Sequence, residues 1–186
     1  MPRHVKGILF ADYVRMIRGQ KTVDWSRHLA EEDMVYLVAR VQPNDWYPMA
    51  TFERMGNAIL TEIANGDVEA ARMWGRASVD QLRFATPSLV AEDDPLETLM
   101  RFRVLRSTFF DFEALDVRTA ATDHASIVIR YHMGPMAEEA ASFQTMGFFE
   151  RLLVVARAQA VQASFGQRSW EDGRPTVLDL QWEPPL

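Results

Sequence analysis

The sequence predicts an α+β fold in which a helical N-terminal lobe is followed by a C-terminal β-β-α-β-β lobe. Three observations lead to this prediction. Apolar residues recur at helical spacing as far as residue 109, alternation of apolar and polar residues begins near Phe112, and a long helical pattern over 136–158 separates two pairs of strand-like segments. We therefore expect one antiparallel sheet of four strands, with the long helix packed on it.

The first helical segments are delimited by capping and stop signals. Residues 5–19 predict a helix that ends at a glycine, and its apolar stripe consists of Ile8, Leu9, Val14 and Ile17. Asp24 can cap a short helix that runs through Leu29. Residues 33–39 predict another short helix, which ends before Pro43.

Three longer helices follow, and each has a start signal. Pro48 follows Asn and Asp, which can cap free N–H groups, and proline is tolerated in a first turn. Asp67 can cap the next helix, and Asp94 with Pro95 starts the third. The predicted helices span residues 46–63, 68–84 and 96–109.

The C-terminal half combines alternating segments with one long helix. A turn at Asp123-His124 joins the first two strands into a hairpin, and a turn at 171–174 joins the last two. The long helix spans 136–158. The predicted strands span residues 112–119, 125–132, 160–168 and 176–182.

No repeat, low-complexity segment or polar linker separates the two halves. We therefore treat residues 1–186 as a single domain with two lobes, a helical lobe at 1–109 and a sheet-and-helix lobe at 110–186. The short apolar run Ile8–Phe10 is no signal peptide, and no stretch approaches a membrane span. We expect a cytoplasmic protein that does not enter a membrane.

Composition excludes several classes of chemistry. The chain has no cysteine, so it has no disulfide, thiolate zinc site, iron–sulfur cluster or cysteine nucleophile. Its net charge of −6 argues against sequence-independent nucleic-acid binding, which needs clustered Lys and Arg. The glycines form no phosphate-binding loop, and no serine sits in a nucleophile elbow.

The polar residues that remain offer few candidate sites. The four histidines, His4, His28, His124 and His132, show no metal-ligand spacing, so we expect no metal. Arg103 and Arg106 are neighbours on a predicted helix and could hold an anion, although a solvated face with a Glu97–Arg101 pair is the simpler interpretation. The tryptophans fall where the periodicity already requires core.

The chain resembles H-NOX and related heme-NO-binding-like domains. The run Val5–Phe10 is similar to the Lys-Gly-apolar opening of that family, Tyr47-Pro48 enters an amphipathic helix as it does there, and Trp74-Gly75-Arg76 stands where the family often has Phe-Gly. The order of elements also resembles four-vinyl-reductase-type ligand-binding domains and a myxobacterial protein group. The resemblance covers nearly the whole chain and implies an H-NOX-like fold.

The departures from the family pattern concern heme. Heme-binding members carry a proximal histidine on the helix before the first hairpin, whereas residues 96–109 contain none and place Arg103 and Arg106 in that region. The family motif Tyr-x-Ser-x-Arg holds the heme propionates. Here Tyr131 is kept, but Met133 and Pro135 replace the serine and the arginine. We therefore expect no cofactor.

Two functional hypotheses follow, and neither is an enzyme. The first is a heme-free sensory module that binds a small apolar or anionic ligand between the lobes, as the four-vinyl-reductase-type domains suggest, with Tyr131, Arg103 and Arg106 as ligand-binding residues. The second is a protein–protein interaction module whose cavity is filled by Trp, Phe and Met side chains. Partners would then be an unknown protein or a small ligand, and self-association as a homodimer is compatible with both. An unrecognised enzyme is the third alternative.

Overall fold

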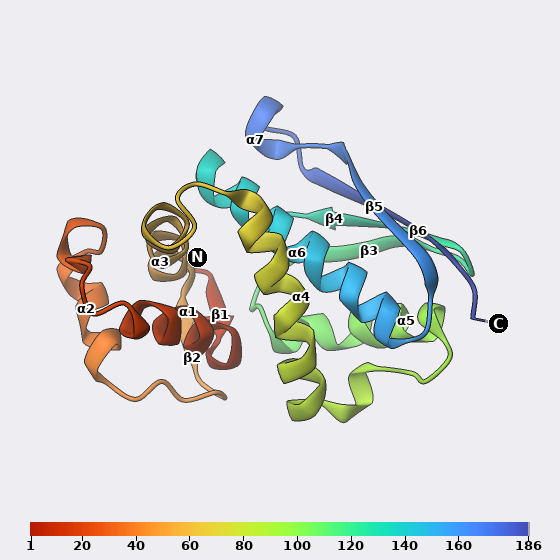
Figure 1. The fold of residues 1–186 in the computed structure, drawn as a ribbon, viewed down its shortest axis with the longest axis horizontal. Coiled ribbons are helices and arrows are strands. Elements are labelled where there is room, and N and C mark those ends of the chain that lie inside the picture. The colour runs from red at the N-terminus through yellow and green to blue at the C-terminus, as the bar shows by residue number, and fades with distance from the viewer. Residues whose placement is uncertain (186) are drawn as a thin grey trace. The chain divides into compact units, whose positions relative to one another are not determined.

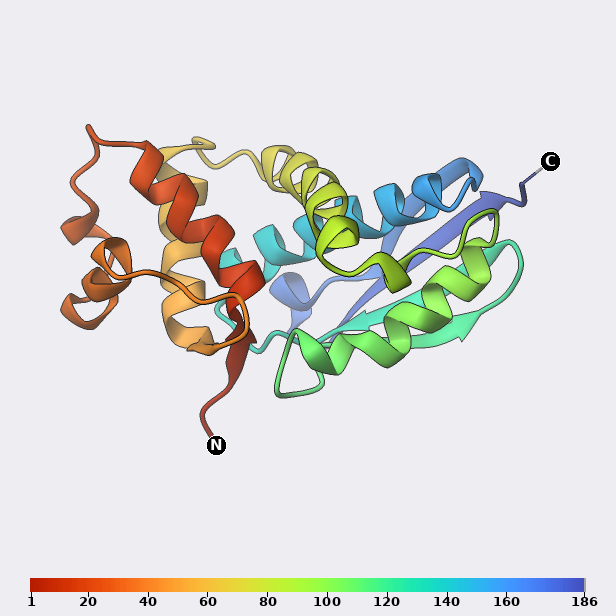
Figure 2. The same cartoon turned by 90° about the horizontal axis from the view of Figure 1, so that it is seen from below.

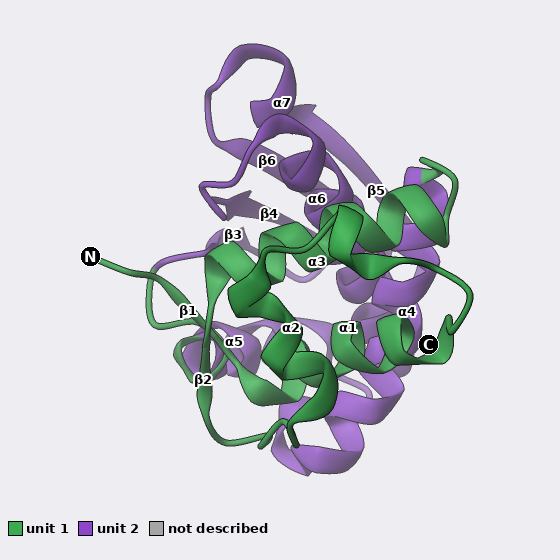
Figure 3. Cartoon of the chain, turned by 90° about the vertical axis from the view of Figure 1, so that its left-hand side faces the viewer, with its two compact units in different colours: residues 1–67, 107–112 green, residues 68–106, 113–186 purple. Residues whose placement is uncertain are grey.

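The structure, a computed structural model, describes residues 1–185 and consists of two compact units (Figure 1, Figure 3). Unit 1 comprises Met1–Asp67 and Ser107–Phe112, and unit 2 comprises Val68–Arg106 and Glu113–Leu186. Two helices that the sequence analysis placed in the helical lobe therefore group with the sheet. Their packing partners, described below, are the reason. No helix in the described part of the chain is long and apolar enough to cross a membrane.

Unit 1 is a small helical layer closed by a two-stranded ribbon. Its strands pair in antiparallel fashion, with Val5 opposite Tyr47. An aromatic cluster fills the space between the helices: the Phe10 ring stacks on Tyr47 at 4.5 Å, and Tyr13 stacks on Phe52 at 4.2 Å. The elements are β1 (His4–Lys6), α1 (Gly7–Gly19), a 3₁₀ turn (Trp25–Arg27), α2 (Glu31–Val38), β2 (Trp46–Pro48) and α3 (Met49–Glu62).

A fully buried carboxylate, Asp33, joins α2 to α3. It accepts hydrogen bonds from the Ala30 backbone N–H at 2.9 Å, the Thr51 hydroxyl at 2.7 Å and the Arg54 guanidinium at 2.6 and 2.7 Å. Burial acts to raise the Asp33 pKa, but the hydrogen bonds from Arg54 and Thr51 outweigh it and hold the pKa below its ordinary value. The carboxylate thus caps one helix and clamps the next.

Unit 2 holds the four-stranded sheet that the sequence predicts. Every neighbouring pair is antiparallel, and the strand order is β3-β4-β6-β5. Alternate residues of the central strands, such as Ile127, Leu178 and Leu180, are fully buried on the helix-covered face. The strands are β3 (Leu115–Ala120), β4 (His124–Ile129), β5 (Gln159–Gln167) and β6 (Thr176–Glu183).

Helices cover one face of this sheet. The long helix α6 (Pro135–Val155) packs on the strands, and α5 (Pro95–Leu105) runs alongside β3 (Figure 2). Asp94 caps α5 by accepting the Glu97 N–H at 2.9 Å, and Pro95 occupies its first turn, as the sequence predicts. A short helix, α7 (Ser169–Asp172), and the left-handed Gly173 make the turn between β5 and β6.

Helix α4 (Val68–Ala85) packs on α6 so closely that the two helix backbones are in contact. A Cβ added to Gly75 would overlap the Gln144 carbonyl oxygen, and one added to Gly147 would overlap the Arg72 carbonyl oxygen. Only glycine permits this approach at either position. Next to the crossing, the buried Glu150 of α6 accepts hydrogen bonds from Arg72 at 2.5 Å and Arg76 at 2.7 Å.

The structure corrects the sequence prediction at several boundaries. Strand β3 begins at Leu115 and not at residue 112, β4 ends at Ile129 and not at residue 132, and α6 ends at Val155 and not at residue 158. Trp46 and Tyr47 form a strand and not the first turn of a helix, because they pair with β1. Residues 4–6 are likewise a strand, and α1 begins at Gly7. Helix α5 ends at Leu105, and a 3₁₀ turn at Arg106–Thr108 replaces the last turn expected of the 96–109 helix.

The Asp33 clamp predicts a pH-dependent contribution to stability. We expect Asp33→Asn to lower the free energy of unfolding at pH 7 by about 2–3 kcal/mol, because Arg54 loses the carboxylate that holds it. The deficit relative to wild type should shrink as the pH falls through about 4 and below, since the wild-type carboxylate, whose folded pKa is lowered, is then protonated. Urea titrations of both proteins at pH 7, 5 and 3.5 measure this difference in the free energy of unfolding.

Glu32→Gln is the matched control, because Glu32 also faces Arg54, at 3.3 Å, but is exposed. It should cost less than about 0.5 kcal/mol. Equal losses for the two variants, or a deficit for Asp33→Asn that does not change with pH, would contradict the clamp.

The helix crossing predicts an unusual response to alanine. Within a helix, Gly→Ala ordinarily stabilises by up to about 1 kcal/mol. Gly147→Ala should instead destabilise unit 2 by about 1–3 kcal/mol or more, because its methyl group meets the Arg72 carbonyl of α4. Chemical denaturation measures this, with Gly19→Ala as control, since a Cβ at that position contacts nothing. An unchanged or raised midpoint for Gly147→Ala would refute the close approach.

Candidate functional site

Tyr131, which follows β4, is buried inside unit 2. Its hydroxyl lies 2.6 Å from the Thr145 hydroxyl of α6, and the Thr145 hydroxyl in turn donates to the Ala141 carbonyl at 2.8 Å. Because a threonine hydroxyl has one proton, Tyr131 is the donor in the first bond. The hydrogen bond expected of a buried phenol is therefore present.

The surroundings of Tyr131 keep it protonated. Burial raises the pKa of the phenol, the hydrogen bond to Thr145 acts against this, and the Glu138 carboxylate raises the pKa further. The phenol is thus a neutral hydrogen-bond donor tied to α6. Its role as a ligand-binding residue stays a prediction, and as a neutral phenol it would contact a ligand without a charge.

The two predicted anion-binding arginines do not converge on Tyr131. Arg103 lies on α5 with its side chain exposed to solvent. Arg106 is half-buried and donates to the Arg103 carbonyl, so it closes the C-terminal end of α5. The expected pair of Glu97 and Arg101 is present, because Arg101 Nε donates a hydrogen bond to Glu97 Oε1 at 3.0 Å.

The segment after β4 corresponds to the one that holds the heme propionates in the family that the sequence resembles. The Met133 backbone N–H donates to the buried Glu138 carboxylate at 2.9 Å. A carboxylate thus occupies the neighbourhood in which the family motif places serine and arginine. A heme propionate is also negatively charged, so Glu138 would repel it. These residues do not fit a propionate clamp.

The inner face of α5 does not fit an axial ligand either. Its buried residues are Pro95, Thr98, Leu99 and Phe102, none of which binds iron in the way that a histidine does. Phe102 packs edge-on against Phe149 of α6 at 4.8 Å and lies 5.6 Å from Phe148. Aromatic side chains therefore fill the space between α5 and α6.

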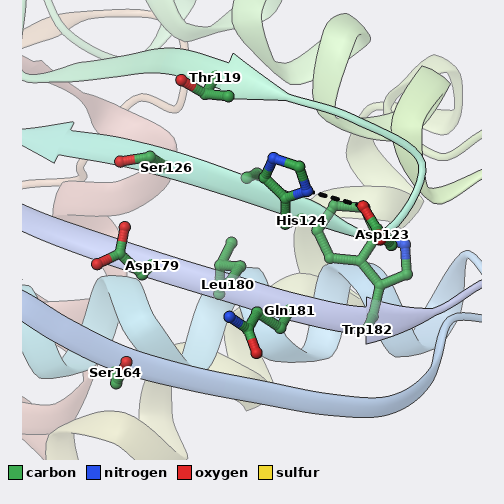
Figure 4. A pocket seen from close by; sticks show the side chains of 10 residues that line it. Thr119, Asp123, His124, Ser126, Ser164, Asp179, Leu180, Gln181 and Trp182 are labelled. Atoms are coloured by element: carbon green, nitrogen blue, oxygen red, sulfur yellow. Dashed lines mark hydrogen bonds and ion pairs between the residues drawn. The ribbon is translucent and has the colours of Figure 1, made fainter.

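A second region, which the sequence analysis did not single out, is a hollow on the face of the sheet opposite the buried core residues (Figure 4). Its volume is about 770 Å³. Thr119, Ser126, Asp179 and Ser164 form one row across all four strands, because the register places each opposite the next. His124 and Gln181 form an adjacent pair nearer the β3–β4 turn.

The lining of this hollow is polar and contains no lysine or arginine. His124 is oriented by Asp123, whose Oδ1 lies 2.7 Å from Nδ1 (Figure 4). Among the described residues, no hydroxyl is hydrogen-bonded to the other ring nitrogen, so the pair activates no nucleophile here. The described residues also contain no group of His, Asp and Glu side chains that could hold a metal ion.

Comparison with solved structures shows the fold. Two structures of an H-NOX protein from K. algicida, both unliganded in the Fe(II) state and one carrying an alanine-to-glycine substitution, match with a TM-score of 0.68 at 13% and 14% identity. The match covers 97% of this chain and 98% of those chains. A variant H-NOX protein from T. tengcongensis matches with a TM-score of 0.61 at 13% identity, covering 97% of this chain and 99% of that one.

No protein-family model matches the sequence, and no curated protein matches it. The likeness to the solved structures extends over almost the whole chain. The chain therefore has an H-NOX-like fold, as the sequence resemblance predicts.

The Tyr131–Thr145 bond can be tested by a double-mutant cycle. Tyr131→Phe should cost about 1 kcal/mol, and Thr145→Val about 1–3 kcal/mol, because the latter leaves the buried phenol without its acceptor. The double variant should cost less than the sum of the two, since both remove the same bond. Strict additivity would argue against the bond. Tyr36→Phe is a control, because no hydrogen bond of its hydroxyl is found among the described residues.

Proposed function

We propose that this protein is a heme-free regulatory module that acts by binding, through a protein partner, a small ligand or both, and that it catalyses no reaction. The observation that carries the proposal is the replacement of the heme-holding chemistry within unit 2. The buried face of α5 presents apolar side chains and a threonine, and Glu138 takes the neighbourhood of the propionate clamp. The fold is retained while its iron-binding groups are not.

Two features support a binding function. The first favours a protein partner: Phe84 at the end of α4 is 90% exposed, and Val104 on α5 is 76% exposed. Each is a large apolar side chain left in water, which a protein partner could cover. The second favours a small ligand, because the hollow on the sheet has the volume of a ligand site. A cytoplasmic location is part of the same proposal.

The absence of reactive groups supports a module that is not an enzyme. The chain has no cysteine, and the described residues hold no cluster that could bind a metal. The strongly held carboxylates, Asp33 and Glu150, are each paired with arginine, which suits a structural role and not acid–base catalysis. Turnover of any substrate by the purified protein would overturn this part of the proposal.

A hemin titration tests the heme-free state. We expect the purified protein to show no Soret band and to acquire no stoichiometric one on addition of hemin, because α5 offers no axial ligand and Glu138 disfavours a propionate. An H-NOX protein loaded under the same conditions is the positive control. A stoichiometric band that disappears on substitution of a single residue would show that the chain holds heme through another ligand.

A further inference from the structure

We propose that the hollow on the outer face of the sheet binds the ammonium or guanidinium group of a small organic cation, with the Asp179 carboxylate as counter-ion. This inference gives a ligand class to the proposed binding function and rests on that function. It concerns a different part of unit 2 from Tyr131 and α5, so the two can fail separately.

Asp179 lies in the centre of the row that crosses the sheet. Ser126 is its register partner on β4, and Ser164 is its partner on β5, so hydroxyl-bearing residues flank it on both sides (Figure 4). Directly opposed residues of neighbouring strands have Cβ atoms about 4.5–5.5 Å apart. A cation bound at Asp179 would therefore have hydroxyl oxygens within reach for its remaining N–H groups.

The neighbouring edge strand leaves room for the carboxylate. A Cβ added to Gly166 of β5 would lie 2.5 Å from the Asp179 Oδ2 atom. The carboxylate thus leans into the space above a glycine, where any other residue would displace it. It is held half-buried on the sheet instead of extending into solvent.

Asp179 lacks the arginine partner that other carboxylates of this protein have. Asp33 and Glu150 are bonded to arginines, and Asp116, on the same face of the sheet, lies 3.6 Å from Arg118. Among the described residues, Asp179 has neither a hydrogen-bond nor an ion-pair partner. A carboxylate that is partly removed from water without a partner is unfavourable, and a bound cation relieves that cost.

The residues at one end of the hollow are Asp123, His124 and Trp182. Trp182 is 4% exposed, and its indole N–H has no acceptor among the described residues. Along β6, Trp182 alternates with Gln181 in the same way as Leu178 and Leu180, so its ring belongs to the buried face of the sheet and not to the hollow. The lining at this end therefore contributes a second carboxylate, Asp123, which is a favourable neighbour for an organic cation.

The charge of the lining selects the class of ligand. Asp123 and Asp179 are both in the lining, which has no lysine or arginine, so phosphates and carboxylates would be repelled. A bare metal ion is disfavoured, because no cluster of three suitable side chains exists among the described residues. A volume of about 770 Å³ suits an organic molecule.

Isothermal titration calorimetry on the full chain tests the proposal with two cations, putrescine and agmatine, which end in ammonium and guanidinium groups. Butane-1,4-diol and succinate serve as neutral and anionic analogues. We expect saturable binding of at least one cation and none of the analogues, and weaker binding at high salt. Asp179→Asn should weaken the affinity about tenfold, because it removes a charge-assisted contact.

Asp116→Asn is the matched control, since it removes an equal charge from the same face of the sheet outside the hollow. It should leave the affinity within about twofold of wild type. If Asp179→Asn does not fold, amide chemical shifts in the wild type decide: cation-dependent changes must centre on Ser126, Ser164 and Asp179. No saturable binding of either cation, equal binding by Asp179→Asn, or shifts centred elsewhere would overturn the site.

The hemin titration separates this inference from the function on which it rests. Asp179→Asn should behave like wild type toward hemin. Failure of cation binding in a protein that still binds no hemin removes only the sheet site, whereas stoichiometric heme binding removes the heme-free function.

Discussion

The backbone contact between α4 and α6 is the constraint on which unit 2 depends. Gly75 and Gly147 bring the two helices together until each faces a carbonyl oxygen of the other, and Glu150 fixes the rotation by binding two arginines of α4. The hydrogen bonds from Arg72 and Arg76 outweigh the effect of burial and lower the pKa of Glu150. The Glu150 carboxylate is therefore ionised at neutral pH. The long helix is thereby held between α4 and the sheet.

This arrangement determines what the interior of unit 2 can hold. With α6 fixed, its aromatic residues Phe148 and Phe149 meet Phe102 of α5, and its Thr145 receives the Tyr131 hydroxyl. Apolar contacts and the hydrogen bond between Tyr131 and Thr145 therefore define this part of the interior of unit 2. An H-NOX-like fold and a heme site depend on different residues: the fold follows from helix and strand packing, and a heme site needs a few specific polar groups.

The sequence was sufficient for the order of the longer helices and of the four strands of the sheet, but not for the short strands β1 and β2 or for close contacts. Caps with a local signal, such as Asp94 with Pro95, and alternation along β6 predicted their elements within a few residues. Trp46 and Tyr47 were misassigned because a strand of three residues has no periodicity, and only its pairing with β1 defines it. In the sequence, Gly75 and Gly147 look like ordinary helical glycines. Their role is visible only when α4 and α6 are packed against each other.

The same reasoning explains why the sheet hollow was missed while Tyr131 was found. Tyr131 belongs to a contiguous motif, whereas Asp179 is one polar residue in an alternating strand, where an outward-facing aspartate is expected. Its significance comes from register, which places it between two serines on different strands and above a glycine. Register depends on long-range pairing and not on local pattern. The outer face of the sheet thus carries an aspartate with no hydrogen-bond or ion-pair partner among the described residues, and the proposed cation site depends on that feature.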